Sequence, residues 1–367
     1  MGITLPVSLG EALDKLTILD IKIHKIQDER RKDCQKEYDL LDVTLKPYRT
    51  TYDYYYKLLR EINLEIWELQ DTFHGKDTAP EEGAAICKKI LEENDRRFRV
   101  KSKLNHAASS LLKEQKGYAR RRVFFYGHLG LGDMFWMNGA VRYLATTFDE
   151  VVVACKERNL ENVKAMYADD PTIHPFSLKD EVSDVPFFRW RHHIEQDEEL
   201  TVLTCGQHSA NPRIYEFPHS FYDDLKMSRD IRTKYFHVPT VAEATALYEA
   251  MGGRKYAIIH EQSSTKTLSI WEAVQKQKPE LLLLDINRNH YAAEHPYYTL
   301  AGMVVGKPLL HYKMLLENAS EIHLLESSLY CFASHLDLSK VERRCCYDAF
   351  DHSNERLGVF TTCVLDV

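Results

Sequence analysis

The feature that constrains this fold most is an apolar run that ends in a glycine-rich turn and continues as a helix. Residues 123–126, Val-Phe-Phe-Tyr, are typical of a buried strand, and residues 127–132, Gly-His-Leu-Gly-Leu-Gly, form the turn. Apolar residues then recur at helical spacing at Met134, Met137, Val141 and Leu144. An open α/β sheet builds its ligand site in this way, at the carboxyl end of a strand beside the start of a helix.

Three residues of this segment are candidate site residues. Gly130 and Gly132 would let the backbone approach a substrate closely, because glycine has no side chain. Asp133 directly follows the turn, and a carboxylate there can take a proton from a substrate hydroxyl as a general base. Asp133 would also suit the N-cap of the helix, and the two roles are compatible. His128 and His260 are alternative bases.

Residues 1–117 are predicted to be helical. Ser8 and Glu11 fit a capping box, in which each side chain accepts a hydrogen bond from the other residue's backbone amide. Pro47 marks a break or a new start. An apolar stripe with steps of three and four begins the segment, at Leu9, Leu13, Leu16, Leu19, Ile23 and Ile26. The stripe predicts a helical hairpin or bundle that either packs within its own chain or forms a homodimer.

From residue 122 the pattern changes to alternating strands and helices. Strands are predicted over 123–126, 151–154, 200–205, 256–260, 281–284 and 322–325. Such alternation indicates βαβ units and parallel sheets, and 367 residues are enough for two or three domains. We therefore expect an α/β protein, with a helical domain over 1–117, a Rossmann-like domain over 118–240 and a second Rossmann-like domain over 241–367.

The second α/β domain carries a polar loop, residues 263–266, after its first predicted strand. Ser263, Ser264 and Thr265 offer hydroxyls and Lys266 an ammonium, and a helix N-terminus is expected beside them. Together these groups suit a diphosphate. The alternative interpretation makes the serines ordinary caps and the lysine an ordinary surface residue.

A second group of candidates lies at the ends of other strands of this domain. Ser327 and Ser328 can cap a helix while offering donors to an anion. Asp285 and Glu326 each end a strand, and a strand-end acid binds ribose hydroxyls in dinucleotide folds. His260 ends the first strand and can donate to a phosphate.

Charge and hydropathy exclude some classes of protein. The formal net charge of -7 argues against a nucleic-acid binder, which needs a basic face. No apolar run approaches the roughly 20 residues that span a bilayer, and the first residues do not have the pattern of a signal peptide. We therefore expect a cytoplasmic protein without a transmembrane segment.

A metal ion is not expected from the sequence. The eight cysteines form no C-x-x-C pair and no His/Cys set with zinc spacing. No D-x-D metal motif ends a predicted strand. The paired acids at 169–170 and 223–224 have no glycine turn around them and are predicted to be solvated loop charges.

The motifs resemble those of glycosyltransferases with the GT-B fold. The segment from Tyr126 to Asp133, with the helix that follows, resembles the opening of the ADP-heptose:LPS heptosyltransferase group, in which the matching aspartate is the catalytic base. The segment from Glu317 to Ser328 resembles the nucleotide-sugar site of bacterial and viral polysaccharide transferases. The expected proline after the first helix and the Gly-Leu-x-His run are missing, so neither heptose nor ADP is implied. Residues 7–22 resemble an uncharacterised helical domain of bacterial proteins.

The resemblance implies a pair of Rossmann-type domains that transfers a sugar from a nucleoside-diphosphate sugar to a hydroxyl of a glycan acceptor. It implies an inverting enzyme that needs no cofactor and no metal, with Asp133 as base. Two alternatives remain open at this point. One is a sugar-nucleotide epimerase of the same architecture, and the other is a non-catalytic scaffold that acts through the helical domain.

Overall fold

The computed structural model describes residues 5–75, 79–117, 121–179, 200–206, 218–264, 266–347 and 358–364. The chain divides into two compact units. The first consists of Met1–Arg122, Leu144–Val151 and Asp169–Thr172, and the second of Val123–Tyr143, Val152–Ala168 and Ile173–Val367. A helical N-terminal region therefore precedes a mixed α/β region, as expected. The predicted division of the α/β region at residue 240 stays a prediction.

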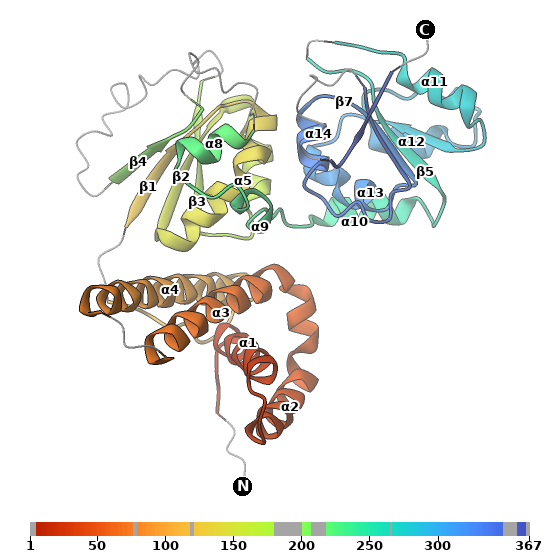
Figure 1. Cartoon of the computed structure of the whole chain (residues 1–367). Helices are drawn as coiled ribbons and strands as arrows, with labels where there is room; N and C mark the ends of the chain where they lie inside the picture. Colours follow the sequence, from red (N-terminus) through yellow and green to blue (C-terminus); the bar gives the residue numbers. More distant parts are fainter. Residues whose placement is uncertain are drawn as a thin grey trace. The chain divides into compact units, whose positions relative to one another are not determined.

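The helices of the first unit follow one another along the chain, and α3 lies beside α4 (Figure 1). Their bounds are α1 Leu9–Lys25, α2 Arg30–Thr51, α3 Asp53–Gly75 and α4 Pro80–Ala107. The predicted break at Pro47 is wrong, because α2 continues through this residue and ends at Thr51. Because proline has no N–H, Pro47 removes one hydrogen bond of α2, and the helix continues in spite of this loss.

The apolar stripe of α1 forms the core of this unit. Leu13, Leu16 and Leu19 are fully or almost fully buried, and α1 packs against α2, α3 and α4. The buried members of the stripe therefore pack within their own unit, and the homodimer stays a prediction. Ser8 is the N-cap of α1 as predicted, and its Oγ accepts from the backbone N–H of Glu11 at 3.2 Å. The Glu11 carboxylate instead pairs with Lys101 of α4.

Three polar contacts join α3 and α4 to other segments of the same unit. Lys103 Nζ lies 2.6 Å from Asp170 Oδ2, and both side chains are buried. The Tyr55 hydroxyl lies 3.0 Å from a carboxylate oxygen of Asp169, and Arg99 pairs with Asp149 at 2.8 Å. The expectation that Asp169 and Asp170 are solvated is wrong. Buried cations and donors of the helices need acceptors, and this acidic pair supplies them.

The first sheet has the strand order β3-β2-β1-β4. Its strands are β1 Arg122–Tyr126, β2 Glu150–Lys156, β3 Ile173–Leu178 and β4 Leu200–Thr204. The helices and 3-10 turn that follow in this part of the chain are α5 Leu131–Thr147, η1 Glu157–Asn159, α6 Leu160–Met166, α8 His219–Asp224 and α9 Ile231–Lys234. The residues from Met134 to Arg142 are all buried, which explains why most of them are apolar, with Asn138 and Arg142 as the exceptions.

The second sheet has the order β6-β5-β7-β8-β9, and all its neighbouring strands run parallel. Its strands are β5 Tyr256–His260, β6 Leu282–Asp285, β7 Glu321–Leu325, β8 Arg343–Tyr347 and β9 Thr361–Cys363. The helices around it are α10 Ala242–Ala250, α11 Ile270–Gln277, α12 Tyr298–Val304, η4 Leu309–Tyr312, α13 Lys313–Glu317 and α14 Ser328–Ala333 (Figure 1). β5, β6 and β7 are buried throughout, as strands of a parallel sheet covered on both faces are. Among the described residues, no helix combines the length and apolar character needed to cross a membrane.

Candidate functional site

Each sheet has a point at which the strand order reverses, and ligands of open α/β folds bind beside such points. In the first sheet this point lies between β1 and β4, where the backbone N–H of Cys205 donates to the carbonyl of Tyr126 at 3.2 Å. In the second sheet it lies between β5 and β7. The turn that ends in Asp133 follows β1, and Glu326, Ser327 and Ser328 follow β7. Asp133, Glu326, Ser327 and Ser328 therefore follow strands that flank a reversal point, whereas Asp285 ends β6, which flanks neither.

Asp133 lies in the first turn of α5 with about a quarter of its side chain exposed. Its Oδ2 is 3.8 Å from Nδ1 of His128. The other ring nitrogen of His128, Nε2, lies 2.5 Å from the carbonyl oxygen of Gly206. A carbonyl only accepts, so Nε2 carries a proton, and in the neutral ring Nδ1 is left as an acceptor on the side of Asp133. The carboxylate thus has an imidazole beside it that can share a proton.

Two glycines make the close packing of this turn possible. A Cβ on Gly130 would lie 2.6 Å from Asp133 Oδ2. A Cβ on Gly132 would lie 2.9 Å from Cys331 Sγ and 3.5 Å from Cα of Ser328. Gly130 therefore leaves room for the carboxylate, and Gly132 lets the turn contact the first turn of α14.

The pKa of the Cys331 thiol is shifted by the charges around this contact. Burial raises its pKa well above the usual value, and the negative charges of Asp133 and Glu326 raise it further. The two carboxylates, one after β1 and one after β7, thus act on the same thiol. Glu326 and Ser328 are both partly exposed.

His260 and Ser327 fix the end of the second sheet. Ser327 Oγ lies 3.0 Å from His260 Nδ1 and accepts from the backbone N–H of Tyr330 at 3.4 Å, as the N-cap of α14. Burial lowers the pKa of His260 to about 4, so the ring is neutral at pH 7. Both side chains are held by internal hydrogen bonds, which suits residues that position the loop.

The predicted phosphate loop at 263–266 has a different structure from the one expected. The backbone N–H of Ser263 donates to the carbonyl of Lys266 at 2.8 Å, and the N–H of Lys266 lies 3.2 Å from Ser263 Oγ. This closed turn ends before the helix, because α11 begins only at Ile270. Ser264 and Lys266 are exposed; Thr265 lies outside the described residues. The helix N-terminus that was expected directly after this loop therefore lies further along the chain, at Ile270.

A buried carboxylate binds the start of α11 instead. Glu261, the residue after β5, accepts from the backbone N–H of Trp271 through Oε2 at 3.0 Å. A carboxylate is a favourable partner for a helix N-terminus. The place predicted for an external anion is therefore occupied by a side chain of the chain itself.

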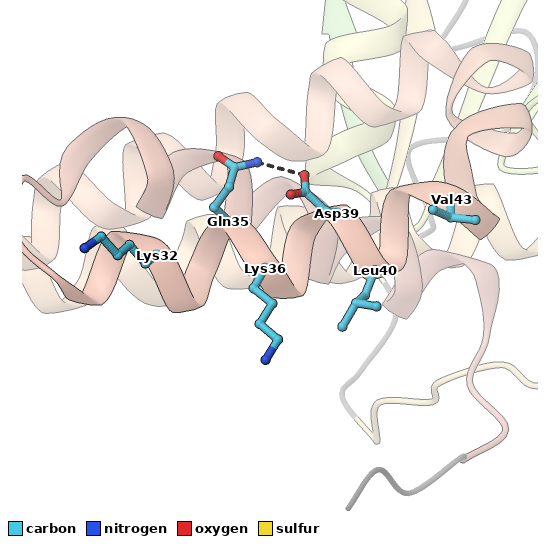
Figure 2. Close-up of a pocket in the computed structure, with 6 residues that line it drawn as sticks. All are labelled: Lys32, Gln35, Lys36, Asp39, Leu40 and Val43. Carbon is cyan, nitrogen blue, oxygen red and sulfur yellow. Dashed lines mark hydrogen bonds between the residues drawn. The ribbon is translucent and has the colours of Figure 1, made fainter.

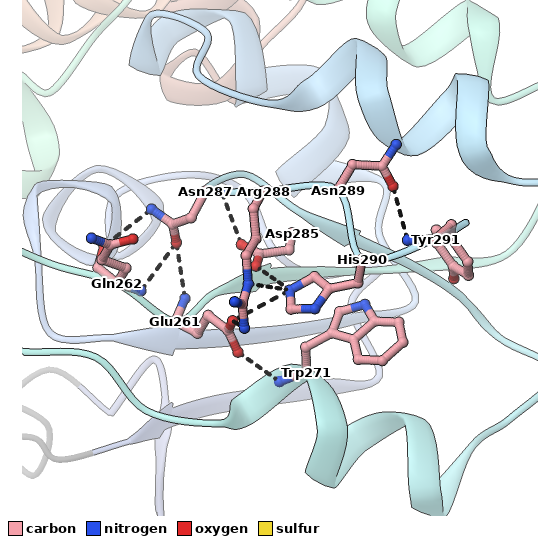
Figure 3. Close-up of polar contacts among 9 residues, drawn as sticks. All are labelled: Glu261, Gln262, Trp271, Asp285, Asn287, Arg288, Asn289, His290 and Tyr291. Atoms are coloured by element: carbon pink, nitrogen blue, oxygen red, sulfur yellow. Dashed lines mark hydrogen bonds and ion pairs between the residues drawn. The ribbon is translucent and has the colours of Figure 1, made fainter. Parts of the chain in front are cut away.

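Glu261 belongs to a cluster with Asp285 and His290 (Figure 3). His290 Nε2 lies 2.7 Å from Asp285 Oδ2 and 3.3 Å from Glu261 Oε1. Arg288 Nη2 also lies 2.9 Å from Glu261 Oε1, and the indole ring of Trp271 stacks on the His290 ring at 4.4 Å. Burial raises the pKa of the Asp285 carboxyl to about 6.

Of this cluster, only Asp285 was a candidate from sequence. Glu261 directly follows β5 and Asp285 ends β6, and these strands are neighbours. The ends of two neighbouring parallel strands meet at one edge of the sheet, so the carboxylate pair could have been predicted once the strand order was known. His290 reaches the cluster from the loop after β6, and no pattern in the sequence marks it.

One hollow lies on the exposed face of α2 (Figure 2). Its volume is about 590 Å³, and it is lined by Lys32, Gln35, Lys36, Asp39, Leu40 and Val43. All these residues come from one helix, and the polar contact among them is the bond from Gln35 Nε2 to Asp39 Oδ1 at 2.8 Å. Nothing in this arrangement provides an acid–base pair or a set of metal ligands.

Comparisons with known proteins match different parts of the chain. A family of unknown function (DUF6165) matches residues 3–123. No curated protein matches the sequence. One similar solved structure is TibC from enterotoxigenic E. coli H10407, which is described as a bacterial iron-containing dodecameric glycosyltransferase. It is 15% identical to this chain with a TM-score of 0.40, and the match covers 65% of this chain and 61% of that chain. TibC described as a dodecameric iron-containing heptosyltransferase in complex with ADP-D-beta-D-heptose is 14% identical with a TM-score of 0.37, over 62% and 59%. The chain thus spans about three fifths of the length of these structures.

The expectation that no metal takes part is corrected by these findings. Both structures are described as iron-containing. Within the described residues, the ligand atoms of Glu261, Asp285 and His290 also lie within 4.8 Å of one another. Cysteine spacing and the D-x-D motif are local patterns in the sequence. They do not reveal this set, because Glu261 meets Asp285 and His290 only through the pairing of β5 with β6.

Proposed function

We propose that this chain is a GT-B-type glycosyltransferase that moves a sugar from a nucleoside-diphosphate sugar to a hydroxyl of a glycan acceptor. The observation that carries the proposal is the position of the polar loops at both strand-order reversals. Asp133 follows β1 at one of them, and Glu326, Ser327 and Ser328 follow β7 at the other. The contact of Gly132 with Cys331 and Ser328 supports a single site built from both loops.

In the proposed reaction Asp133 acts as the general base. Its carboxylate takes the proton of the acceptor hydroxyl while that oxygen attacks the anomeric carbon of the donor sugar. The bond from the anomeric carbon to the diphosphate oxygen breaks, and its electron pair leaves with the nucleoside diphosphate. A direct displacement of this kind inverts the anomeric centre. His128, 3.8 Å from Asp133, would share the proton taken up.

The leaving diphosphate would be bound by the second α/β part. Ser264 and Lys266 are exposed at the end of β5 and can donate a hydroxyl and an ammonium to the phosphates. Ser328 adds a hydroxyl after β7, and these donors would stabilise the charge that grows in the transition state. His260, Ser263 and Ser327 would position these loops, since their own polar groups are already bonded.

A strand-end acid would bind the ribose of the donor. Asp285 is buried, and its two oxygens contact Asn287 and His290. Glu326 is partly exposed at the end of β7. We therefore assign the ribose hydroxyls to Glu326.

The first test combines a ligand screen with one substitution. Thermal unfolding in the presence of UDP, GDP, ADP, CMP and their sugars identifies the donor, because a ligand at about 100 times its Kd adds about 2.7 kcal/mol. With that donor, Asp133→Asn should lower the transfer rate by about 10²–10⁴-fold and leave donor binding nearly unchanged. The matched control is Asp230→Asn, an exposed aspartate, which should retain full activity.

Three outcomes would contradict the proposal. Normal turnover by Asp133→Asn would remove Asp133 from the mechanism. Conversion of the donor sugar without an acceptor would identify an epimerase. Absence of a shift with every nucleotide would favour a scaffold that works through the helical unit.

A further inference from the structure

We propose that Glu261, Asp285 and His290 form a binding site for one divalent transition-metal ion. Three potential ligand atoms face one another, namely Glu261 Oε1, Asp285 Oδ2 and His290 Nε2 (Figure 3). Two ligands that each lie about 2.1 Å from one ion are roughly 3.0–3.4 Å apart. The Nε2 distances of 2.7 Å to Asp285 and 3.3 Å to Glu261 lie close to this range.

The outer atoms of the three side chains are already held in place. Glu261 Oε2 accepts from the backbone N–H of Trp271 at 3.0 Å. Asp285 Oδ1 accepts from the backbone N–H of Asn287 at 2.9 Å. The indole of Trp271 covers the His290 ring with an angle of 3° between the planes. Each carboxylate is therefore left with one oxygen that faces the imidazole nitrogen, and such outer contacts are typical of metal ligands.

His290 Nε2 has more polar neighbours than one ring nitrogen can pair with. This atom lies near two carboxylate oxygens and also 3.2 Å from Nε of Arg288. A ring nitrogen has either one proton or one lone pair. A proton on Nε2 can be donated to Asp285 Oδ2 but then faces the Arg288 N–H, and a lone pair can accept from Arg288 Nε but then faces two carboxylate oxygens. A cation between the three ligand atoms would use the lone pair of Nε2 and both carboxylates at once.

Arg288 has the properties of a group that stands in for the cation. Its guanidinium bonds Glu261 Oε1, but 59% of its side chain is exposed. It can therefore turn toward solvent when a metal ion takes its place, and the ion would then compensate the charges of Glu261 and Asp285, which are 2% and 0% exposed. One nitrogen and two oxygens suit Mn²⁺, Fe²⁺, Co²⁺ or Zn²⁺ better than Mg²⁺ or Ca²⁺, which prefer oxygen alone. Three protein ligands leave further positions for water or an anion.

The test measures metal binding directly, on the full chain after removal of metal with a chelator. Mn²⁺ is titrated first, because thiols are poor ligands for it and the cysteines should not compete. The concentration of the free ion is followed by its paramagnetic resonance. Zn²⁺, which binds more tightly, is titrated second. We expect the wild-type protein to bind one equivalent that Asp285→Asn and His290→Gln each lose or bind about 100-fold more weakly. His295→Gln, an exposed histidine of the same loop, should bind as the wild type does.

Arg288→Ala separates a metal site from a purely structural ion pair even where the other variants fold poorly. In a metal site this change removes a competitor, so binding should stay equal or become tighter. The proposal is overturned if the triad variants bind as many equivalents of Mn²⁺ and of Zn²⁺ as the wild type does. It is also overturned if Arg288→Ala abolishes binding in a folded protein. Because the readout is stoichiometry, it does not depend on whether the chain transfers a sugar.

Discussion

At the scale of single residues, the turn before α5 depends on the missing side chain of Gly130. Gly130 has an ordinary backbone conformation, so its role does not come from a positive φ. Its role is steric, because the carboxylate of Asp133 occupies the place of a Cβ. The sequence shows a glycine at this position, but it does not show which group fills the space that a side chain would take.

Gly130→Ala should therefore impair the proposed transfer while the fold is retained. The added Cβ would lie 2.6 Å from Asp133 Oδ2 and must displace the carboxylate. Since a displacement of about 1 Å can cost about 100-fold in rate, we expect kcat to fall by roughly 10–100-fold. The control is Gly117→Ala, where a Cβ meets nothing within 4 Å. Equal kcat values for the two variants would show that the carboxylate position is unimportant.

His335 makes a second prediction, which concerns pH. Its ring stacks on Phe236 at 4.4 Å, and Arg232 Nη1 lies 3.1 Å from its Nε2. Burial, and then the Arg232 charge, lowers the pKa of His335 to about 3. Between about pH 6.5 and pH 3 the unfolded chain binds a proton that the folded chain excludes. Stability contributed by the neutral ring is therefore present above pH 6.5 and is lost as the pH falls.

Urea unfolding at several pH values tests this expectation. The unfolding free energy of the wild type should fall by up to about 1.4 kcal/mol more per pH unit than that of His335→Gln in this window. His295→Gln, which changes an exposed ring, should follow the wild type. Parallel curves for the wild type and His335→Gln would mean that His335 titrates normally in the folded state.

At the scale of elements, patterns that depend on local chemistry were predicted well. The strand before the turn, the helix after it and the cap at Ser8 are all in place. Patterns that depend on partners elsewhere in the chain were not. The loop at 263–266 has the composition of a phosphate loop, but Glu261 binds the N–H of Trp271 at the start of α11. Which acceptor reaches a helix N-terminus is decided by tertiary packing, and a linear motif does not contain that information.

The cap of α1 gives a prediction at this scale. Ser8→Ala removes the acceptor of the Glu11 N–H, which is a 3.2 Å bond. The loss should cost about 1 kcal/mol in the free energy of unfolding of the helical unit. Ser8→Asp restores an acceptor and should be close to the wild type. Urea unfolding followed by circular dichroism measures both, and equal losses in the two variants would show that the cap is not responsible.

At the scale of the whole molecule, the first unit is assembled from segments that lie far apart in the sequence. Asp149, Asp169 and Asp170 come from the α/β region of the chain but bond to Arg99, Tyr55 and Lys103 of the helices. The family match to residues 3–123 ends near the close of the long first segment of this unit, Met1–Arg122. The capping box and the apolar stripe predict a helical segment of nearly this length, but they do not predict that the three aspartates belong to the same unit.

Lys103 and Asp170 therefore provide a test of how strongly these segments depend on one another. Lys103 Nζ lies 2.6 Å from Asp170 Oδ2, with side chains 4% and 3% exposed. Lys103→Met leaves this buried carboxylate without its cation and should cost about 3–5 kcal/mol in the free energy of unfolding. The double variant Lys103→Met with Asp170→Asn should recover much of that loss, because the amide carries no charge while its oxygen can still accept from Thr172. If the double variant is as unstable as the sum of the two single variants, the pair is not coupled, and the aspartate is kept for a reason other than the charge of Lys103.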